Sequence, residues 1–200
     1  AGPRCTTSSS SMISTPDRHR WPLWAAVAAL AVAASAVGAD RSVADQRLAE
    51  GRAALARGDG IAAEAALRKA LAAGAPREAV AARMGEALLD QGDYAHAREW
   101  LGPTRFAPAE AARAWRMLGR LEMAQHDLPA SAAAFARALA LAPGDSRLWV
   151  DIARLRYVSG QELAAPDAVA EALRLDPGNV RALELRGLMV RDQYGLTAAL

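Results

Sequence analysis

The residue types that usually carry chemistry are present in this chain, but they do not form a catalytic or metal-binding pattern. Gly58 to Ala63 read G-D-G-I-A-A, which matches the G-x-G-x-x-A dinucleotide fingerprint. That fingerprint requires a preceding strand and a βαβ unit, whereas the residues before Gly58 have a helical pattern, so an interhelical turn is favoured. The histidines, His19, His96 and His126, have no histidine or cysteine four residues away. We therefore expect no catalytic residues, no cofactor and no bound metal.

Composition favours helices and argues against a nucleic-acid partner. The chain has 200 residues, of which 52% are hydrophobic and only 5% aromatic. Alanine is abundant, and it is the best helix former. The formal net charge is +2, but Arg4, Arg18 and Arg20 precede Asp40 against Asp17 alone, so the rest of the chain is neutral. The basic balance belongs to the amino-terminal segment, and nucleic acid is not an expected ligand.

An apolar segment follows a polar amino-terminal stretch. Residues 1–20 are expected to be disordered, and residues 1–11 read as a sequence that precedes a natural start at Met12. Residues 21–39 are uncharged and follow Arg18 and Arg20. As a helix they would span roughly 28 Å, enough for a hydrocarbon core. A cleaved signal peptide and a retained transmembrane anchor both fit. Either places the remaining residues outside the cytoplasm, in the periplasm or anchored there to the inner membrane.

A period of 34 residues runs through the remainder of the chain. One column of small residues comprises Gly51, Gly85, Gly119, Ala153 and Gly187. A column of larger residues, sixteen positions after each of the first four, comprises Leu67, Leu101, Phe135 and Val169. The small residues would allow two antiparallel helices to approach closely, and the larger ones would fill the space between neighbouring repeats. Gly58-Asp59 and Gly92-Asp93 stand where a first helix should stop, because glycine allows a left-handed turn and aspartate caps the next helix.

The best-preserved unit, residues 112–145, resembles the tetratricopeptide repeat family. The family pattern is W-x2-L-G-x2-Y followed by A-x3-F, A and P. The matching residues here are Trp115, Leu118, Gly119, Ser131, Phe135, Ala138 and Pro143. The resemblance implies an all-α, right-handed α-solenoid of helix-turn-helix repeats behind the apolar leader. It predicts an array over residues 40–200, with repeats at 44–77, 78–111, 112–145 and 146–179 and a partial repeat at 180–200.

The resemblance also implies a binding groove lined by one face of the first helix of each repeat. In repeats three to five that face carries seven arginines against two acids, Asp151 and Glu184. The candidate groove residues are Arg113, Arg116, Arg120, Arg147, Arg154, Tyr157, Arg181 and Arg191. Guanidinium groups suit carboxylates, so a groove for an acidic segment or a peptide carboxy-terminus is one interpretation. A solvated, arginine-rich face without a ligand is the other.

The function expected from these observations is that of a non-enzymatic protein–protein interaction scaffold in the bacterial cell envelope. The partner would be a protein or peptide, and the membrane would be contacted through residues 21–39 if they are not cleaved. The alternative is that the repeats form the targeting portion of a larger enzyme whose catalytic domain lies beyond residue 200. The partner and the cellular process are not encoded in the repeat pattern, because this fold serves many functions.

Overall fold

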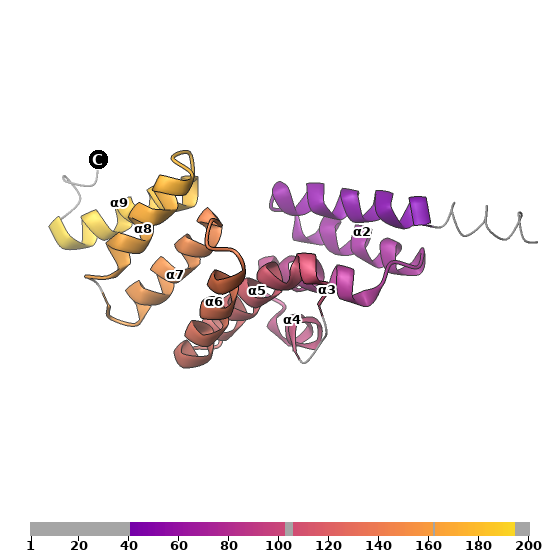
Figure 1. Ribbon diagram of the computed structural model, residues 1–200, viewed down its shortest axis with the longest axis horizontal. Coiled ribbons are helices and arrows are strands. Elements are labelled where there is room, and N and C mark those ends of the chain that lie inside the picture. The colour runs from indigo at the N-terminus through magenta and orange to yellow at the C-terminus, as the bar shows by residue number, and fades with distance from the viewer. Residues whose placement is uncertain (1–40, 103–105, 162, 195–200) are drawn as a thin grey trace, which may run out of the picture. The chain divides into compact units, whose positions relative to one another are not determined.

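The computed structural model describes residues 41–102, 106–161 and 163–194, and within these ranges every regular element is helical (Figure 1). The all-α prediction is therefore confirmed. The described helices belong to one compact unit, Ala39–Leu200. The predicted disordered segment 1–20 and the apolar segment 21–39 lie outside the described residues. Among the helices that are described, none combines the length and the hydropathy needed to cross a bilayer.

The helices follow one another as pairs. Their bounds are residues 41–56 and α2 (Gly60–Ala72), α3 (Arg77–Asp90) and α4 (Tyr94–Leu101), α5 (Ala111–Ala124) and α6 (Leu128–Leu141), α7 (Ser146–Val158) and α8 (Ala165–Leu175), then α9 (Val180–Tyr194). A short 3-10 helix, η1 (Pro108–Glu110), precedes α5. These bounds describe the helices. The limits of the repeats, given above from the sequence, stay a prediction.

Packing between pairs places the first helices side by side. Helix α5 contacts α3 and α7, and α7 in turn contacts α9. Each second helix also contacts the first helix of the next pair, as α4 does with α5 and α6 with α7 (Figure 1). The first helices α3, α5, α7 and α9 therefore share one face, which we call the first-helix face. It is the face on which the candidate groove residues were expected.

Glycine permits the close approach of the two helices within the first three pairs. A Cβ added to Gly51 would lie 2.9 Å from Leu67 Cδ2, and one added to Gly85 would lie 2.5 Å from Leu101 Cδ2. The predicted role of the small column is confirmed. The large column was expected to fill the space between neighbouring repeats. Leu67 and Leu101 belong to one core cluster with Met84 and Met117 of the following pairs, in agreement with that expectation. The same side chains also lie against the glycine of their own pair.

Turns within the pairs use the predicted chemistry. Gly58 and Gly92 have φ values of 75° and 76°, in the left-handed region. The aspartate after each glycine caps the next helix: Asp59 Oδ1 accepts from Ala62 N at 2.9 Å. In the third pair His126 takes the left-handed position with φ 63°, and Asp127 accepts from Ala130 N at 3.0 Å.

Loss of one such cap should have a measurable cost. Replacing Asp127 with alanine removes the acceptor for a backbone N–H at the start of α6, so the free energy of unfolding should fall by about 1 kcal/mol. Urea denaturation followed by circular dichroism would measure it. Asp127→Asn is the matched control, since asparagine caps as well as aspartate does. Equal losses in both variants would contradict the capping role.

Candidate functional site

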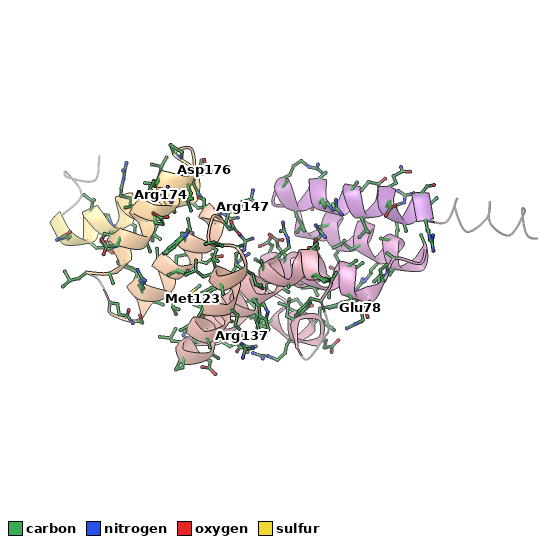
Figure 2. All side chains as sticks on the ribbon, in the orientation of Figure 1. Glu78, Met123, Arg137, Arg147, Arg174 and Asp176 are labelled. Atoms are coloured by element: carbon green, nitrogen blue, oxygen red, sulfur yellow. The ribbon has the colours of Figure 1, made fainter. Side chains whose placement is uncertain are left out.

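Two adjoining cavities on the first-helix face contain most of the candidate groove residues. The first, called here the polar cavity, has a volume of about 460 Å³ and is lined in part by Glu86, Asp90, Arg116, Arg120, Arg147 and Arg181. The second, called the apolar cavity, has a volume of about 550 Å³ and is lined in part by Leu89, Tyr94, Met123, Tyr157, Val158 and Leu188. Arg120 lines both, so the two cavities adjoin. Figure 2 shows Arg147 and Asp176, which both line the polar cavity, and Met123, which lines the apolar one.

The arginines of α5 are compensated by carboxylates. Arg113 Nη1 lies 2.5 Å from Glu86 Oε2, and its Nε lies 3.7 Å from Glu110 Oε2. Arg120 Nη2 donates to Asp90 Oδ1 at 3.2 Å. These arginines are therefore held by acids of neighbouring elements and do not present isolated positive charge.

Arg116 is the most deeply buried of the candidates and is surrounded by three acids. Its side chain is 6% exposed. The Nη2 atom lies 3.6 Å from Glu86 Oε1, Nη1 lies 3.4 Å from Asp145 Oδ2, and Nε lies 3.9 Å from Asp151 Oδ2. Among the described residues, nothing accepts a hydrogen bond from that Nε. Arg116 therefore joins α3, the start of α7 and the body of α7 through charge.

A further buried pair extends the cluster. Arg83 of α3 is 8% exposed, and its Nη2 lies 2.8 Å from Glu110 Oε1 of η1. Burial lowers the pKa of Arg83, although Glu110 opposes that change. An isolated buried guanidinium would be very costly, so this pair is needed to keep the charge at that position.

The remaining arginines of the set are differently placed. Within the described ranges no carboxylate oxygen lies within 4.0 Å of the guanidinium nitrogens of Arg147, Arg154 or Arg181. Arg147 and Arg181 line the polar cavity, and Arg154 lines the apolar cavity. Arg191 is exposed and pairs with Asp192 at 2.9 Å. Ligand binding by any of these residues stays a prediction.

Tyr157, the one aromatic residue among the candidates, lies in the apolar cavity. Its hydroxyl donates a hydrogen bond to Asp192 Oδ2, so α7 and α9 are joined at this end of the face. That bond and the one from Arg191 lower the pKa of Asp192. Tyr157 thus presents its ring to the cavity while its polar atom is occupied.

The fold has counterparts among solved structures. No protein-family model matches the chain, and no curated protein matches it. The crystal structure of MamA aligns with 22% identity and a TM-score of 0.52, over 78% of this chain and 86% of that one. MamA from Desulfovibrio magneticus RS-1 aligns with 20% identity and a TM-score of 0.52, over 78% and 88%. YrrB, described as a TPR protein with an unusual peptide-binding site, aligns with 18% identity and a TM-score of 0.52, over 82% and 87%.

The chain has the tetratricopeptide repeat fold. The expected resemblance is thereby confirmed, since the helix pairs, the glycine contacts and these alignments agree. At such identities the likeness concerns the fold alone, so what the tetratricopeptide array binds has to be argued from its own residues.

Sequence reasoning missed the acids that compensate the arginines. Glu86 was placed on the corresponding face of the second repeat, but Glu110 lies in η1 and Asp145 caps α7, outside the face positions. Asp151 was counted as one of two acids on the face without an indication that it is buried. These ion pairs depend on distances between side chains of successive repeats, and such distances cannot be obtained from the 34-residue period. Within the described ranges, no group of three or more His, Cys, Asp or Glu could hold a metal ion.

Burial gives Asp151 an unusual titration. Its carboxylate lies in the interior, and this raises its pKa above the ordinary value of 3.8, although Arg116, Arg120, Arg154 and Arg181 oppose the shift. The folded protein therefore keeps this proton to a higher pH than the unfolded chain does. The stability that Asp151 contributes is largest below pH 3.8 and declines as the pH rises through its folded-state value.

An asparagine at this position should remove that pH dependence. We expect the free energy of unfolding of Asp151→Asn, minus that of the wild type, to increase as the pH rises above 3.8. Chemical denaturation at a series of pH values measures it. Glu171→Gln is the control with opposite sign, because a hydrogen bond from Arg174 lowers the pKa of this exposed carboxylate. A difference between Asp151→Asn and wild type that does not vary with pH would contradict the prediction.

Proposed function

We propose that the protein is a non-enzymatic scaffold that binds an extended, acidic segment of a partner protein on the first-helix face. The observation that carries the proposal is the division of the arginines into two groups. Arg113, Arg116 and Arg120 are held by acids at short distance. Arg147 and Arg181 line the polar cavity, as Arg116 and Arg120 do, but have no ion pair among the described residues. Their planar donor groups are available for a carboxylate from outside.

The charge arrangement also indicates where the carboxylates of the ligand would lie. Glu86 and Asp90 line the α3 side of the polar cavity and would repel an acidic segment there. Arg147 lies in the first turn of α7 and Arg181 in the first turn of α9, so the opposite side of the cavity attracts an acidic segment. Asp176 also lines the cavity, and its Oδ1 accepts from the backbone of Gly178 at 3.1 Å. The acidic segment would therefore contact the amino-terminal ends of α7 and α9, away from α3.

Peptide binding on this fold has support from one neighbour. YrrB, with which the chain shares 18% identity, is described as having an unusual peptide-binding site. The chain offers two adjoining cavities on one face, of about 460 and 550 Å³, a size that accommodates side chains of a ligand. Both support a partner that presents an extended segment.

We also propose that the protein is located in the cell envelope and that its solenoid is right-handed. Support for the envelope comes from the uncharged residues 21–39 behind Arg18 and Arg20. Fractionation of cells that express the full chain tests it: the protein should be found in the membrane or periplasmic fraction. Recovery of all of the chain from the cytosolic fraction would contradict an envelope location.

Peptide binding is tested by selection and titration. A random peptide library displayed on phage is selected on the full chain, and enriched peptides are labelled and titrated by fluorescence anisotropy. Against the Arg147→Glu, Arg181→Glu double variant, affinity should fall by about tenfold or more, since two attractive contacts become repulsive. The matched control is Arg41→Glu, Arg186→Glu, which makes the same charge change at exposed residues that line neither cavity.

The outcomes separate the alternatives. Enriched acidic peptides that lose affinity only in the groove variant support the proposal. Failure of the library to enrich any sequence would contradict peptide binding. Equal losses in the groove and control variants would show a general charge effect and contradict recognition by Arg147 and Arg181. Circular dichroism of each variant checks that helicity is unchanged.

A further inference from the structure

The apolar cavity has the features of a binding site in its own right. Its walls come from the carboxyl-terminal ends of α3, α5 and α7, the first residue of α4 and the middle of α9. Val158 at the end of α7 is 57% exposed, and Tyr94 at the start of α4 is 41% exposed. Large apolar side chains that are exposed singly are normal, but several gathered around one cavity mark a contact site.

Packing against the core supports part of the cavity wall. Met123 and Leu188 are partly buried and pack with one side against the core that contains Phe135 and Leu155. They therefore form a supported floor. Val158 is the last residue of α7 and Tyr94 is the first residue of α4. Both are exposed, and we call them the rim of the cavity. A supported apolar floor with an exposed apolar rim favours a side chain inserted from outside, because insertion removes both surfaces from water.

We infer that the apolar cavity binds one large apolar side chain, aromatic or branched, of the same acidic segment whose carboxylates contact Arg147 and Arg181. This inference rests on the proposed function and adds the chemistry of a second contact. The ligand is then defined by two parts, an apolar anchor and neighbouring carboxylates. Neither cavity alone would specify it.

The charges around the apolar cavity favour this occupant. Arg120 and Arg154 line it together with Glu184. Arg120 is held by Asp90, whereas Arg154 has no ion pair within the described ranges. An apolar residue flanked by acids gains attraction from Arg154 as it inserts, and a basic segment would be repelled there.

The spacing of the two parts follows from the shared wall. Arg120 lines both cavities, so the anchor and the first carboxylate are separated by only a short length of ligand. An extended chain advances about 3.3 Å per residue, and successive side chains point to opposite sides. The apolar and acidic residues should therefore occur within a few positions of each other and not in separate segments.

Two variants isolate the anchor. Val158→Glu places a carboxylate beside the cavity. Insertion of the apolar side chain would then remove water from that carboxylate at a cost, and the carboxylate would repel the acidic neighbours of the anchor. Leu141→Glu is a close match, because Leu141 is the last residue of α6 as Val158 is of α7, and the two are 56% and 57% exposed. Leu141 lines neither cavity. Both side chains are exposed, so neither change should unfold the chain.

Peptides enriched on the full chain provide the probe. Each is aligned with the others, and each of its residues is replaced in turn by alanine. We expect an apolar residue within a few positions of an acidic pair, and a loss of about ten- to a hundredfold when that residue becomes alanine. Val158→Glu should weaken the parent peptide by a similar factor, and Leu141→Glu should leave it unchanged. The peptide with alanine in place of the anchor should bind Val158→Glu and Leu141→Glu with the same affinity.

Failure of this inference is distinguishable from failure of the proposed function. If the enriched peptides are acidic, depend on Arg147 and Arg181, and yet show no apolar position, the proposed function stands and the anchor is overturned. Equal affinity of Val158→Glu and Leu141→Glu for the parent peptide would also overturn it. If no peptide is enriched, the proposed function itself is contradicted and the inference falls with it.

Discussion

Replacing Arg116 with methionine should lower the free energy of unfolding by about 3–5 kcal/mol, the usual cost of removing one partner from a buried charge pair. Arg116 is 6% exposed and faces three carboxylates, from Glu86, Asp145 and Asp151. Without it Glu86 and Asp151, which are themselves buried, would each lose a neighbouring guanidinium group. Methionine preserves most of the apolar stem, so loss of packing contributes little to the expected change.

The measurement is urea denaturation at neutral pH, with Arg147→Met as the matched control. Arg147 also lines the polar cavity, but it is exposed and has no ion pair within the described ranges. Its replacement should change the free energy of unfolding by no more than about 0.5 kcal/mol. Equal losses in the two variants would show that the buried position of Arg116 is not the cause.

A triple variant separates charge from shape. When Arg116→Met is combined with Glu86→Gln and Asp151→Asn, the uncompensated acids are removed, and we expect most of the lost stability to return. The expectation follows because buried ion pairs are often replaceable by neutral groups at little cost. It is strengthened by the Nε of Arg116, which has no hydrogen-bond acceptor among the described residues. A triple variant as unstable as Arg116→Met alone would contradict the charge argument.

The cluster around Arg116 also ties three first helices together. Asp145 accepts from the backbone N of Arg147 at 2.9 Å with Oδ1 and faces Arg116 with Oδ2. The cap of α7 and the charge cluster thus share one carboxylate. In a repeat array each unit contacts only its neighbours, so such links set how successive repeats are joined. The proposed ligand-binding side of the face is then built next to α5, which is joined to α3 and α7 by these ion pairs.

The fold followed from the sequence because its determinants recur. Gly51, Gly85 and Gly119 are needed at equal spacing, since a side chain at any of them would collide with the next helix. The turns were equally readable, because Gly58 and Gly92 adopt a conformation that few other residues tolerate. His126 is the exception, a histidine in the left-handed region where the pattern has glycine.

The site was only partly predictable from the sequence. The spacing placed arginines on one helical face, and the structure places Arg116, Arg120, Arg147 and Arg181 around one cavity. The spacing did not show which arginines are buried, nor which carboxylates of other repeats pair with them. Glu110 of η1 pairs with Arg83 of α3, 27 positions away, and no periodic column contains both residues. The distinction between compensated and available arginines therefore required the three-dimensional arrangement.

Gly119→Ala should destabilise the array by about 1–3 kcal/mol, because an added methyl group overpacks the third pair. A Cβ on Gly119 would meet the ring of Phe135, with 2.5 Å to Cδ1 and 2.9 Å to Cζ. Phe135 is 2% exposed and cannot swing away without displacing its neighbours in the core. The flexible Leu101 opposite Gly85 could yield more easily, so Gly85→Ala should cost less than Gly119→Ala. Thermal or urea denaturation would rank the variants.

Gly187 provides the control, since it occupies the same column in α9 but has nothing within 4 Å of an added Cβ. There the same substitution removes only the poor helix propensity of glycine and should stabilise the protein by up to about 1 kcal/mol. The two substitutions therefore have opposite expected signs at positions that the period makes equivalent. If both variants gain stability, the close contact with Phe135 does not constrain the third pair. If both lose it, the glycine of α9 has a contact that the described residues do not show. If Gly119→Ala loses stability and Gly187→Ala gains it, the large residue that faces the column is the reason for a small residue there. The repeat pattern itself would then not require glycine.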